Sequence, residues 1–173
     1  MMHTSEKQNG NKRNPAYECW LNYRPIHDPI AEEYRALCKF ITVNGNSPIL
    51  QSAADELNLG LGSMLGIQPE KGQGTDGITL ANAEKTDLLT PSEKGQILAE
   101  GFMIKLLPQG FVIAGKDDRG ILYGVFAFLR LLQLKTPPQA MNRIENPANI
   151  LRMVNQWDNL DGSIERGYAG GSI

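Results

Sequence analysis

The segment GFMIKLLPQGFVIAG, residues 101–115, decides how the sheet of this protein is built. Two apolar runs, 101–107 and 111–115, are rich in the β-branched and aromatic residues that favour strands. Pro108-Gln109-Gly110 separates them, and a short break of this kind is typical of a hairpin turn. The segment therefore predicts two strands that lie side by side and antiparallel.

The next segment, RGILYGVFAFLRLLQL at residues 119–134, is strongly apolar and predicts a helix. Asp117 and Asp118 come just before it. An aspartate at this position accepts hydrogen bonds from unpaired N–H groups of the first turn and suits the positive end of the helix dipole. Residues 135–149 are rich in Pro, Asn and Gln, which predicts a connection leading out of the domain.

A second helix is predicted nearer the N-terminus. Ser47 suits the N-cap and Pro48 the first helical position, and apolar residues then recur at helical spacing for about 18 residues. Gly60, Gly62 and Gly66 weaken the end of this helix and stop it. The other predicted elements are a helical turn at 30–36, strands at 37–43 and 78–81, and a short helix at 90–99.

This order of strands and helices predicts an α+β fold, with one mostly antiparallel sheet and the helices packed on one of its faces. Residues 1–14 have nothing to bury and are expected to form a disordered tail. We expect the domain to span residues 15–136, a linker to span 137–149, and residues 150–173 to form a separate segment.

The composition excludes some classes of function. The formal net charge is -2, with 17 basic and 19 acidic residues, so the sequence lacks the basic footprint of a nucleic-acid or anionic-membrane binder. No apolar run reaches the ~20 residues that span a bilayer. The polar start has no apolar core of a signal peptide, which leaves a cytoplasmic or a periplasmic location in a bacterium open.

Several short patterns have ordinary structural interpretations. Gly72, Gly74 and Gly77 match the spacing of a dinucleotide-binding loop, but they precede a strand, so we expect a plain loop. Asp117 and Asp118 are adjacent and do not converge on one reacting bond, so we expect a helix cap. The histidines and cysteines show no ligand spacing. We therefore expect no metal, no cofactor, and two free thiols, at Cys19 and Cys38.

Residues 152–173, RMVNQWDNLDGSIERGYAGGSI, differ from the rest of the chain. Trp, Asp, Asn, Glu, Arg and Tyr alternate with glycine in a way that fits neither an amphipathic helix nor a regular strand. Sugar sites use this mixture, because aromatic faces cover C–H surfaces while amides, carboxylates and guanidinium groups bind hydroxyls and acids. A polar loop that satisfies its own turns is an equal alternative from composition alone.

The run from Trp157 to Gly170, WDNLDGSIERGYAG, resembles the segment with which the catalytic barrel of the α-glucuronidases of glycoside hydrolase family 67 opens. Residues 118–126, DRGILYGVF, resemble the last helix of that family's N-terminal domain, and YECWLNY at 17–23 resembles its start. The resemblance covers most of the chain from about residue 16. It implies an N-terminal accessory domain followed by the truncated start of a (β/α)8 barrel.

Members of this family remove (4-O-methyl)-D-glucuronic acid that is α-1,2-linked to the terminal xylose of xylan-derived oligosaccharides. The resemblance implies inverting hydrolysis without a metal, often in a homodimer, with an N-terminal domain like the non-catalytic domain of hexosaminidases. The implied partners of the parent enzyme are glucuronoxylan-derived oligosaccharides.

The family's pattern carries over to this sequence at Trp157, which matches a tryptophan that lines the uronic-acid pocket at the end of the first barrel strand. Asp158, Asn159 and Arg166 fall in the same loop and are implied to support that pocket. The family's catalytic carboxylates lie on later strands, so no catalytic residue is expected here and the 173-residue chain is expected to be inactive. The alternative is a non-catalytic module that binds carbohydrate or protein.

Overall fold

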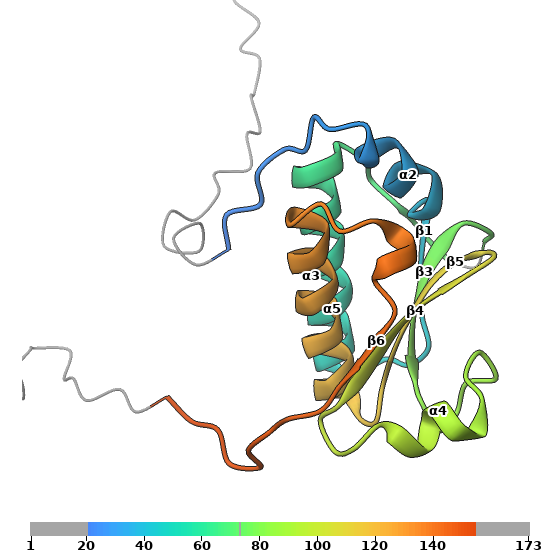
Figure 1. The fold of residues 1–173 in the computed structure, drawn as a ribbon, viewed down its shortest axis with the longest axis vertical. Helices are drawn as coiled ribbons and strands as arrows, with labels where there is room; N and C mark the ends of the chain where they lie inside the picture. The colour runs from blue at the N-terminus through green and yellow to red at the C-terminus, as the bar shows by residue number, and fades with distance from the viewer. Residues whose placement is uncertain (1–20, 73, 155–173) are drawn as a thin grey trace, which may run out of the picture.

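The computed structural model describes residues 21–72 and 74–154 as a six-stranded sheet with helices against it (Figure 1). The strands lie in the order β2-β1-β3-β5-β4-β6. The predicted disordered tail at 1–14 lies outside the described residues. The strands are β1 (Phe40–Val43), β2 (Glu70–Lys71), β3 (Gly77–Asn82), β4 (Phe102–Leu107), β5 (Gly110–Gly115) and β6 (Arg143–Glu145).

The prediction of a mostly antiparallel sheet is wrong, because the sheet is mixed. Strand β1 runs parallel to β2 and β3, and β3 runs parallel to β5, whereas only the pairs of β4 with β5 and with β6 are antiparallel. The predicted hairpin is confirmed as β4–β5. It inserts with β5 next to β3, and this placement makes the central pair of the sheet parallel.

The helices are α2 (Ile30–Leu37), α3 (Pro48–Leu65), α4 (Pro91–Gln96) and α5 (Asp118–Gln133), with a 3-10 turn η1 at Pro138–Ala140. Local chemistry sets the starts of the two long ones. The Ser47 hydroxyl accepts a hydrogen bond from the Leu50 N–H at 3.2 Å, and the Asp117 carboxylate accepts one from the Gly120 N–H at 3.0 Å. Helix α3 ends at Gly66, whose φ of 69° is readily adopted only by glycine.

Helices α3 and α5 stand side by side against one face of the sheet, as Figure 1 shows. One glycine lets the two helices approach each other closely, and a second lets α5 approach the sheet. A Cβ at Gly60 of α3 would lie 2.6 Å from the Leu129 side chain of α5, and one at Gly124 of α5 would lie 2.6 Å from Ile113. The expectation that helices pack on one face is met by these two, while α4 lies elsewhere.

Side chains that alternate along the central strands are buried in two separate hydrophobic clusters, one on each face of the sheet. Ile78, Ile104 and Phe111 face α3 and α5 in the main core. Strand neighbours of these residues face the other side, where residues 83–101, which we call the α4 segment, cover a small cluster. The cluster combines residues of the strands and of the α4 segment: Ala83, Leu89, Ile97, Met103, Val112 and Ala114. Strand β5 is buried along its whole length because it contributes to both.

Strand β6 lies in the segment that was expected to be a linker, and the sequence analysis missed it. Phe102, Met103 and Ile104 of β4 pair with Glu145, Ile144 and Arg143 in antiparallel register. Three residues of alternating charge and aliphatic character carry too short a pattern to predict a strand. The sheet therefore extends beyond α5, and the chain leaves the sheet after Glu145.

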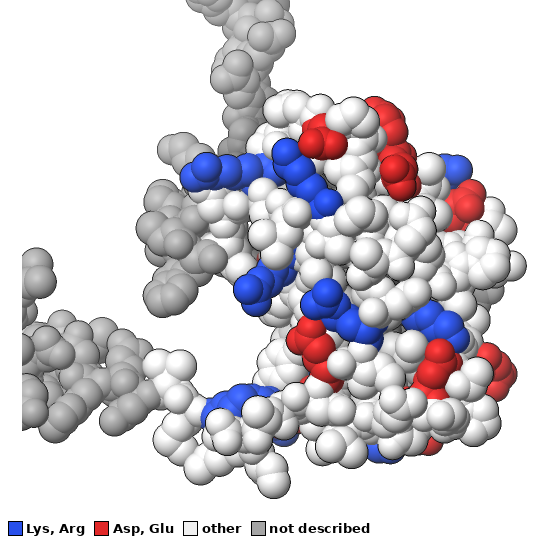
Figure 2. Space-filling view, in the orientation of Figure 1, with Lys and Arg blue, Asp and Glu red and all other residues white. Residues whose placement is uncertain are grey.

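Charge is mixed over the face shown in Figure 2, where basic and acidic side chains lie beside one another. The described residues form nine ion pairs, almost all exposed to solvent, and such pairs typically contribute less than about 1 kcal/mol each. Among the helices of the described part, none is long and apolar enough to cross a membrane.

Candidate functional site

The four residues predicted to bind substrate, Trp157, Asp158, Asn159 and Arg166, lie outside the described residues. The structure does describe the path that leads to them. After β6 the chain continues through residues 146–154 and passes the N-terminal end of α5, as the red-orange segment at the bottom of Figure 1 shows. What holds this path in place determines where the predicted loop begins.

We define the exit corner as Glu100, Tyr123, Asn146 and Arg152. Asn146 fixes its inner end, because its side-chain Oδ1 accepts a hydrogen bond from the Leu98 N–H at 2.8 Å and its Nδ2 donates to the Gln96 carbonyl at 2.9 Å. Both bonds reach back about 50 residues along the chain, so they tie the exit to the α4 segment.

Arg152 fixes the outer end of the exit corner. Its guanidinium pairs with the Glu100 carboxylate and lies 5.4 Å from the centre of the Tyr123 ring on α5. The same group donates to the Asn149 carbonyl at 3.0 Å. Arginine can hold a carboxylate and an aromatic face together because its cation is planar and delocalised.

Glu100 is itself held by its neighbours. Its backbone N–H donates to the Asp117 carboxylate at 2.8 Å, and its own carboxylate also pairs with Arg119 at 2.7 Å. A shallow hollow of about 230 Å³ opens between Phe102, Tyr123, Pro147 and these charged groups. The exit corner therefore anchors the chain, and all of its charged groups are already partnered.

The residues beside Arg152 are apolar but exposed. Ile150, Leu151, Met153 and Val154 are between 73% and 100% exposed in the described structure. A run of exposed apolar residues on an anchored segment is typical of a surface that packs against further structure. This run leads directly into the residues predicted to bind substrate.

Asp117 caps helix α5, as predicted, and Asp118 is the first residue of that helix. The two side-chain oxygens of Asp117 accept hydrogen bonds from the N–H groups of Gly120 and Glu100. Both carboxylate oxygens of Asp117 therefore hold backbone N–H groups, which is a structural role.

The buried ionisable side chains are also structural. Burial raises the pKa of the Cys38 thiol and of the Tyr34 phenol far above their ordinary values. The Tyr34 hydroxyl donates to the Thr136 carbonyl and touches the Met141 sulfur, so it ties α2 to the segment after α5. In the part of the chain that the structure describes, no group of His, Cys, Asp and Glu side chains could hold a metal.

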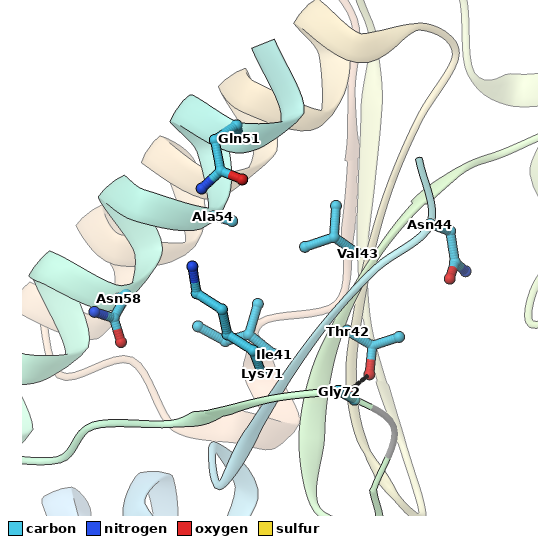
Figure 3. Close-up of a pocket in the computed structure, with 9 residues that line it drawn as sticks. All are labelled: Ile41, Thr42, Val43, Asn44, Gln51, Ala54, Asn58, Lys71 and Gly72. Carbon is cyan, nitrogen blue, oxygen red and sulfur yellow. Dashed lines mark hydrogen bonds between the residues drawn. The ribbon is translucent and has the colours of Figure 1, made fainter. Parts of the chain in front are cut away.

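A second concave feature, which we call the edge pocket, lies between α3 and the β1–β2 edge of the sheet (Figure 3). Its volume is about 340 Å³. The lining residues are Ile41, Thr42, Val43, Asn44, Gln51, Ala54, Asn58, Lys71 and Gly72. Of these residues the sequence analysis singled out only Gly72, and only as part of a plain loop. No motif links the lining residues, and only the fold brings them together.

Comparison with known proteins places the chain among the glycosyl hydrolases. Residues 19–128 match the model described as the N-terminus of glycosyl hydrolase family 67, and residues 131–173 match that family's middle domain. The first match alone covers more than half of the chain. The chain therefore belongs to glycosyl hydrolase family 67, and the resemblance carried by the sequence is confirmed.

The named relatives agree with this assignment. The chain is 33% identical over 161 residues to the probable alpha-glucuronidase A of Aspergillus oryzae and 31% identical over 180 residues to the alpha-glucuronidase A of Emericella nidulans. Each match covers 89% of this chain, but only 19% and 20% of the relatives. The chain thus spans about a fifth of the length of these curated relatives.

A solved structure of a family 138 enzyme targeting pectin rhamnogalacturonan II aligns with 65% of this chain and 12% of its own chain. The sequence identity is 19% and the TM-score is 0.48.

Proposed function

We propose that this chain is the N-terminal part of an inverting α-glucuronidase that releases α-1,2-linked (4-O-methyl)-D-glucuronic acid from xylan-derived xylo-oligosaccharides. The observation that carries the proposal is the order of the two family matches, N-terminus and then middle domain, along one chain whose named relatives are alpha-glucuronidases. Residues up to Glu145 form the accessory domain, and residues from about 150 open the catalytic barrel.

In this proposal Trp157 lines the pocket for the uronic acid. An indole offers a flat apolar face to the C–H side of the sugar or to its 4-O-methyl group. Asp158, Asn159 and Arg166 support the same pocket, and Arg166 is the residue suited to pair with the uronate. The active sites of (β/α)8 barrels are built from the loops at the carboxyl ends of the strands, which is where this loop would lie.

The exit corner supports the proposal from the accessory domain. Arg152 and Asn146 hold the connection against α5 and the α4 segment, so the loop with Trp157 would begin from a fixed point. Inverting hydrolysis also needs two carboxylates roughly 6.5–9.5 Å apart across the scissile bond. We place both on barrel strands that follow this segment, and therefore expect the 173-residue chain alone to release no uronic acid.

The experiment compares this chain with the full reading frame for release of 4-O-methylglucuronic acid from aldouronic acids. We expect activity only in the longer protein. In that protein, Trp157→Ala should lower kcat/KM by about tenfold to a hundredfold, whereas Trp157→Phe should retain much of the wild-type kcat/KM because an aromatic face remains. Melting temperatures of both variants equal to that of the wild-type enzyme would exclude unfolding as the cause of the loss.

An inactive longer protein would refute the proposal. The runner-up is a non-catalytic module that binds carbohydrate or protein, and it would then become the working hypothesis. A homodimer of the longer enzyme is also part of the proposal, and its mass in solution by light scattering tests that part separately.

A further inference from the structure

We propose that the edge pocket binds an oligosaccharide that carries a carboxylate, specifically a xylo-oligosaccharide substituted with a uronic acid. The identity of the sugar rests on the proposed function, whereas the preference for a carboxylate rests on the pocket itself. None of the comparisons assigns a ligand to these residues.

The pocket exists because the edge strand is short. Strand β2 pairs with β1 only at Phe40 and Ile41, and the chain then turns away at Gly72. The second half of β1 is left without an outer neighbour, and α3 forms the opposite wall (Figure 3). A volume of about 340 Å³ falls in the range of small-ligand sites.

The wall formed by α3 offers unused hydrogen-bonding groups. The Asn58 amide has no hydrogen-bond partner within residues 21–72 and 74–154. Gln51 uses its Nε2 to donate to Asp55 at 2.7 Å, which leaves its Oε1 to accept from a ligand. In Figure 3 the side chains of Gln51 and Asn58 project from α3 on either side of the gap that Lys71 enters. Side-chain amides can both donate to and accept from sugar hydroxyls.

The wall formed by β1, which faces α3 across the pocket, is largely apolar. Ile41 and Val43 point from β1 toward α3, where Ala54 lies (Figure 3). The Thr42 hydroxyl donates to the Gly72 carbonyl, so these two groups satisfy each other. An aliphatic surface beside amides suits a pyranose, which presents C–H groups on one side and hydroxyls around its rim.

Lys71 supplies the preference for an acid. Its ammonium enters the pocket from β2, and its side chain is 74% exposed. Its partner is Asp55, at 4.0 Å, which is the longest ion pair among the described residues. An ion pair this long and exposed contributes little to stability. A uronate can therefore replace Asp55 as the partner of the Lys71 ammonium with little loss of free energy.

The test titrates the 173-residue chain with three ligands: aldotetraouronic acid, neutral xylotriose and free D-glucuronate. Binding is followed by ¹H–¹⁵N correlation spectra, in which the side-chain amides of Gln51 and Asn58 give their own signals. We expect aldotetraouronic acid to bind most tightly and to shift both amide signals. Xylotriose lacks the charge and glucuronate lacks the xylose contacts, so each should bind more weakly.

Two variants change the charge of the pocket in opposite directions. Lys71→Gln should weaken binding of aldotetraouronic acid by roughly threefold to tenfold and leave xylotriose unchanged. Asp55→Asn frees Lys71 and should strengthen acid binding by about threefold, a gain that misfolding cannot produce. Lys85→Gln, which removes an exposed lysine outside the pocket, is the matched control and should have no effect.

Equal binding of the acidic and neutral oligosaccharides, or no shift of the Asn58 and Gln51 amides, would overturn the inference. An active longer enzyme whose N-terminal chain binds none of the three ligands would refute the pocket and leave the proposed function standing. Charge-dependent binding by the chain together with an inactive longer protein would refute the proposed function and leave the pocket standing.

Discussion

The two faces of the sheet are covered in different ways. On the first face, two helices of 18 and 16 residues pack over a continuous core that joins α2, α3, α5 and four strands. On the second face, one helix of six residues, with no buried residue of its own, lies over a cluster of six buried side chains. The first face should therefore determine global stability, while the second opens locally.

Three aromatic side chains pack together in the core on the first face. The Phe111 and Phe128 rings meet edge to face with centroids 5.0 Å apart, and the Tyr34 ring packs against both. On the second face the loop between Asn82 and Phe102 contributes only Ala83, Leu89 and Ile97 to the apolar cluster. Polar contacts also hold this loop, including the Asn146 bonds of the exit corner. The path toward the proposed substrate loop thus depends on the less stable face.

The largest expected effect comes from the same substitution made on each face. Ile104 faces the first core and Ile97 the second, and both are almost completely buried. Ile104→Ala should lower the free energy of unfolding by about 4 kcal/mol and Ile97→Ala by about 2 kcal/mol, because the smaller cluster can close around the cavity. Urea denaturation of both variants measures the difference, and equal losses would contradict the comparison.

A smaller effect is expected from the helix caps. Ser47→Ala removes the cap of α3 and Thr90→Ala that of α4, each at a cost of about 1 kcal/mol. The loss at α3 should lower global stability, whereas the loss at α4 should speed amide hydrogen exchange only in the α4 segment. Ser92→Ala, an exposed change within α4, is the control and should alter neither quantity.

The smallest effect is expected at Glu93. The hydrogen bond from Lys105, followed by that from the Thr90 N–H, holds the pKa of the Glu93 carboxyl below its ordinary value of 4.5. A lowered pKa stabilises the fold above pH 4.5 and ceases to do so as pH falls through the folded value.

Glu93→Gln should therefore cost about 0.5 kcal/mol near neutral pH, and the difference from the wild type should disappear in acid. Unfolding by urea across the acid range measures this convergence. A difference that persists at the lowest pH would show that packing, and not charge, makes the contribution.

How much of the fold could be predicted depended on how far apart the interacting residues are. The starts of α3, α4 and α5 were predictable because each cap joins residues three apart in the sequence. The β4–β5 hairpin was predictable because a turn of two residues sets its pairing. The position of β5 beside β3 was missed, although its apolar residues on both faces favour a central strand.

The candidate sites divide in the same way. The predicted substrate residues from Trp157 to Arg166 are contiguous, so a family pattern identifies them, and their geometry lies outside the described residues. The edge pocket combines side chains from β1, α3 and β2 that span residues 41–72, and no local pattern marks it. Arg152 was noted only as part of the polar segment, because its partners Glu100 and Tyr123 are remote in the sequence.

The sequence by itself determined the starts of α3, α4 and α5, the hairpin, and membership of glycosyl hydrolase family 67. Tertiary structure alone decided the mixed sheet, the addition of β6, the close approach of α3 and α5 at Gly60, and the edge pocket. The physical reason is the range of the interactions. Caps and turns are satisfied within a few residues, whereas strand order and pockets depend on which distant segments bury their apolar faces against each other.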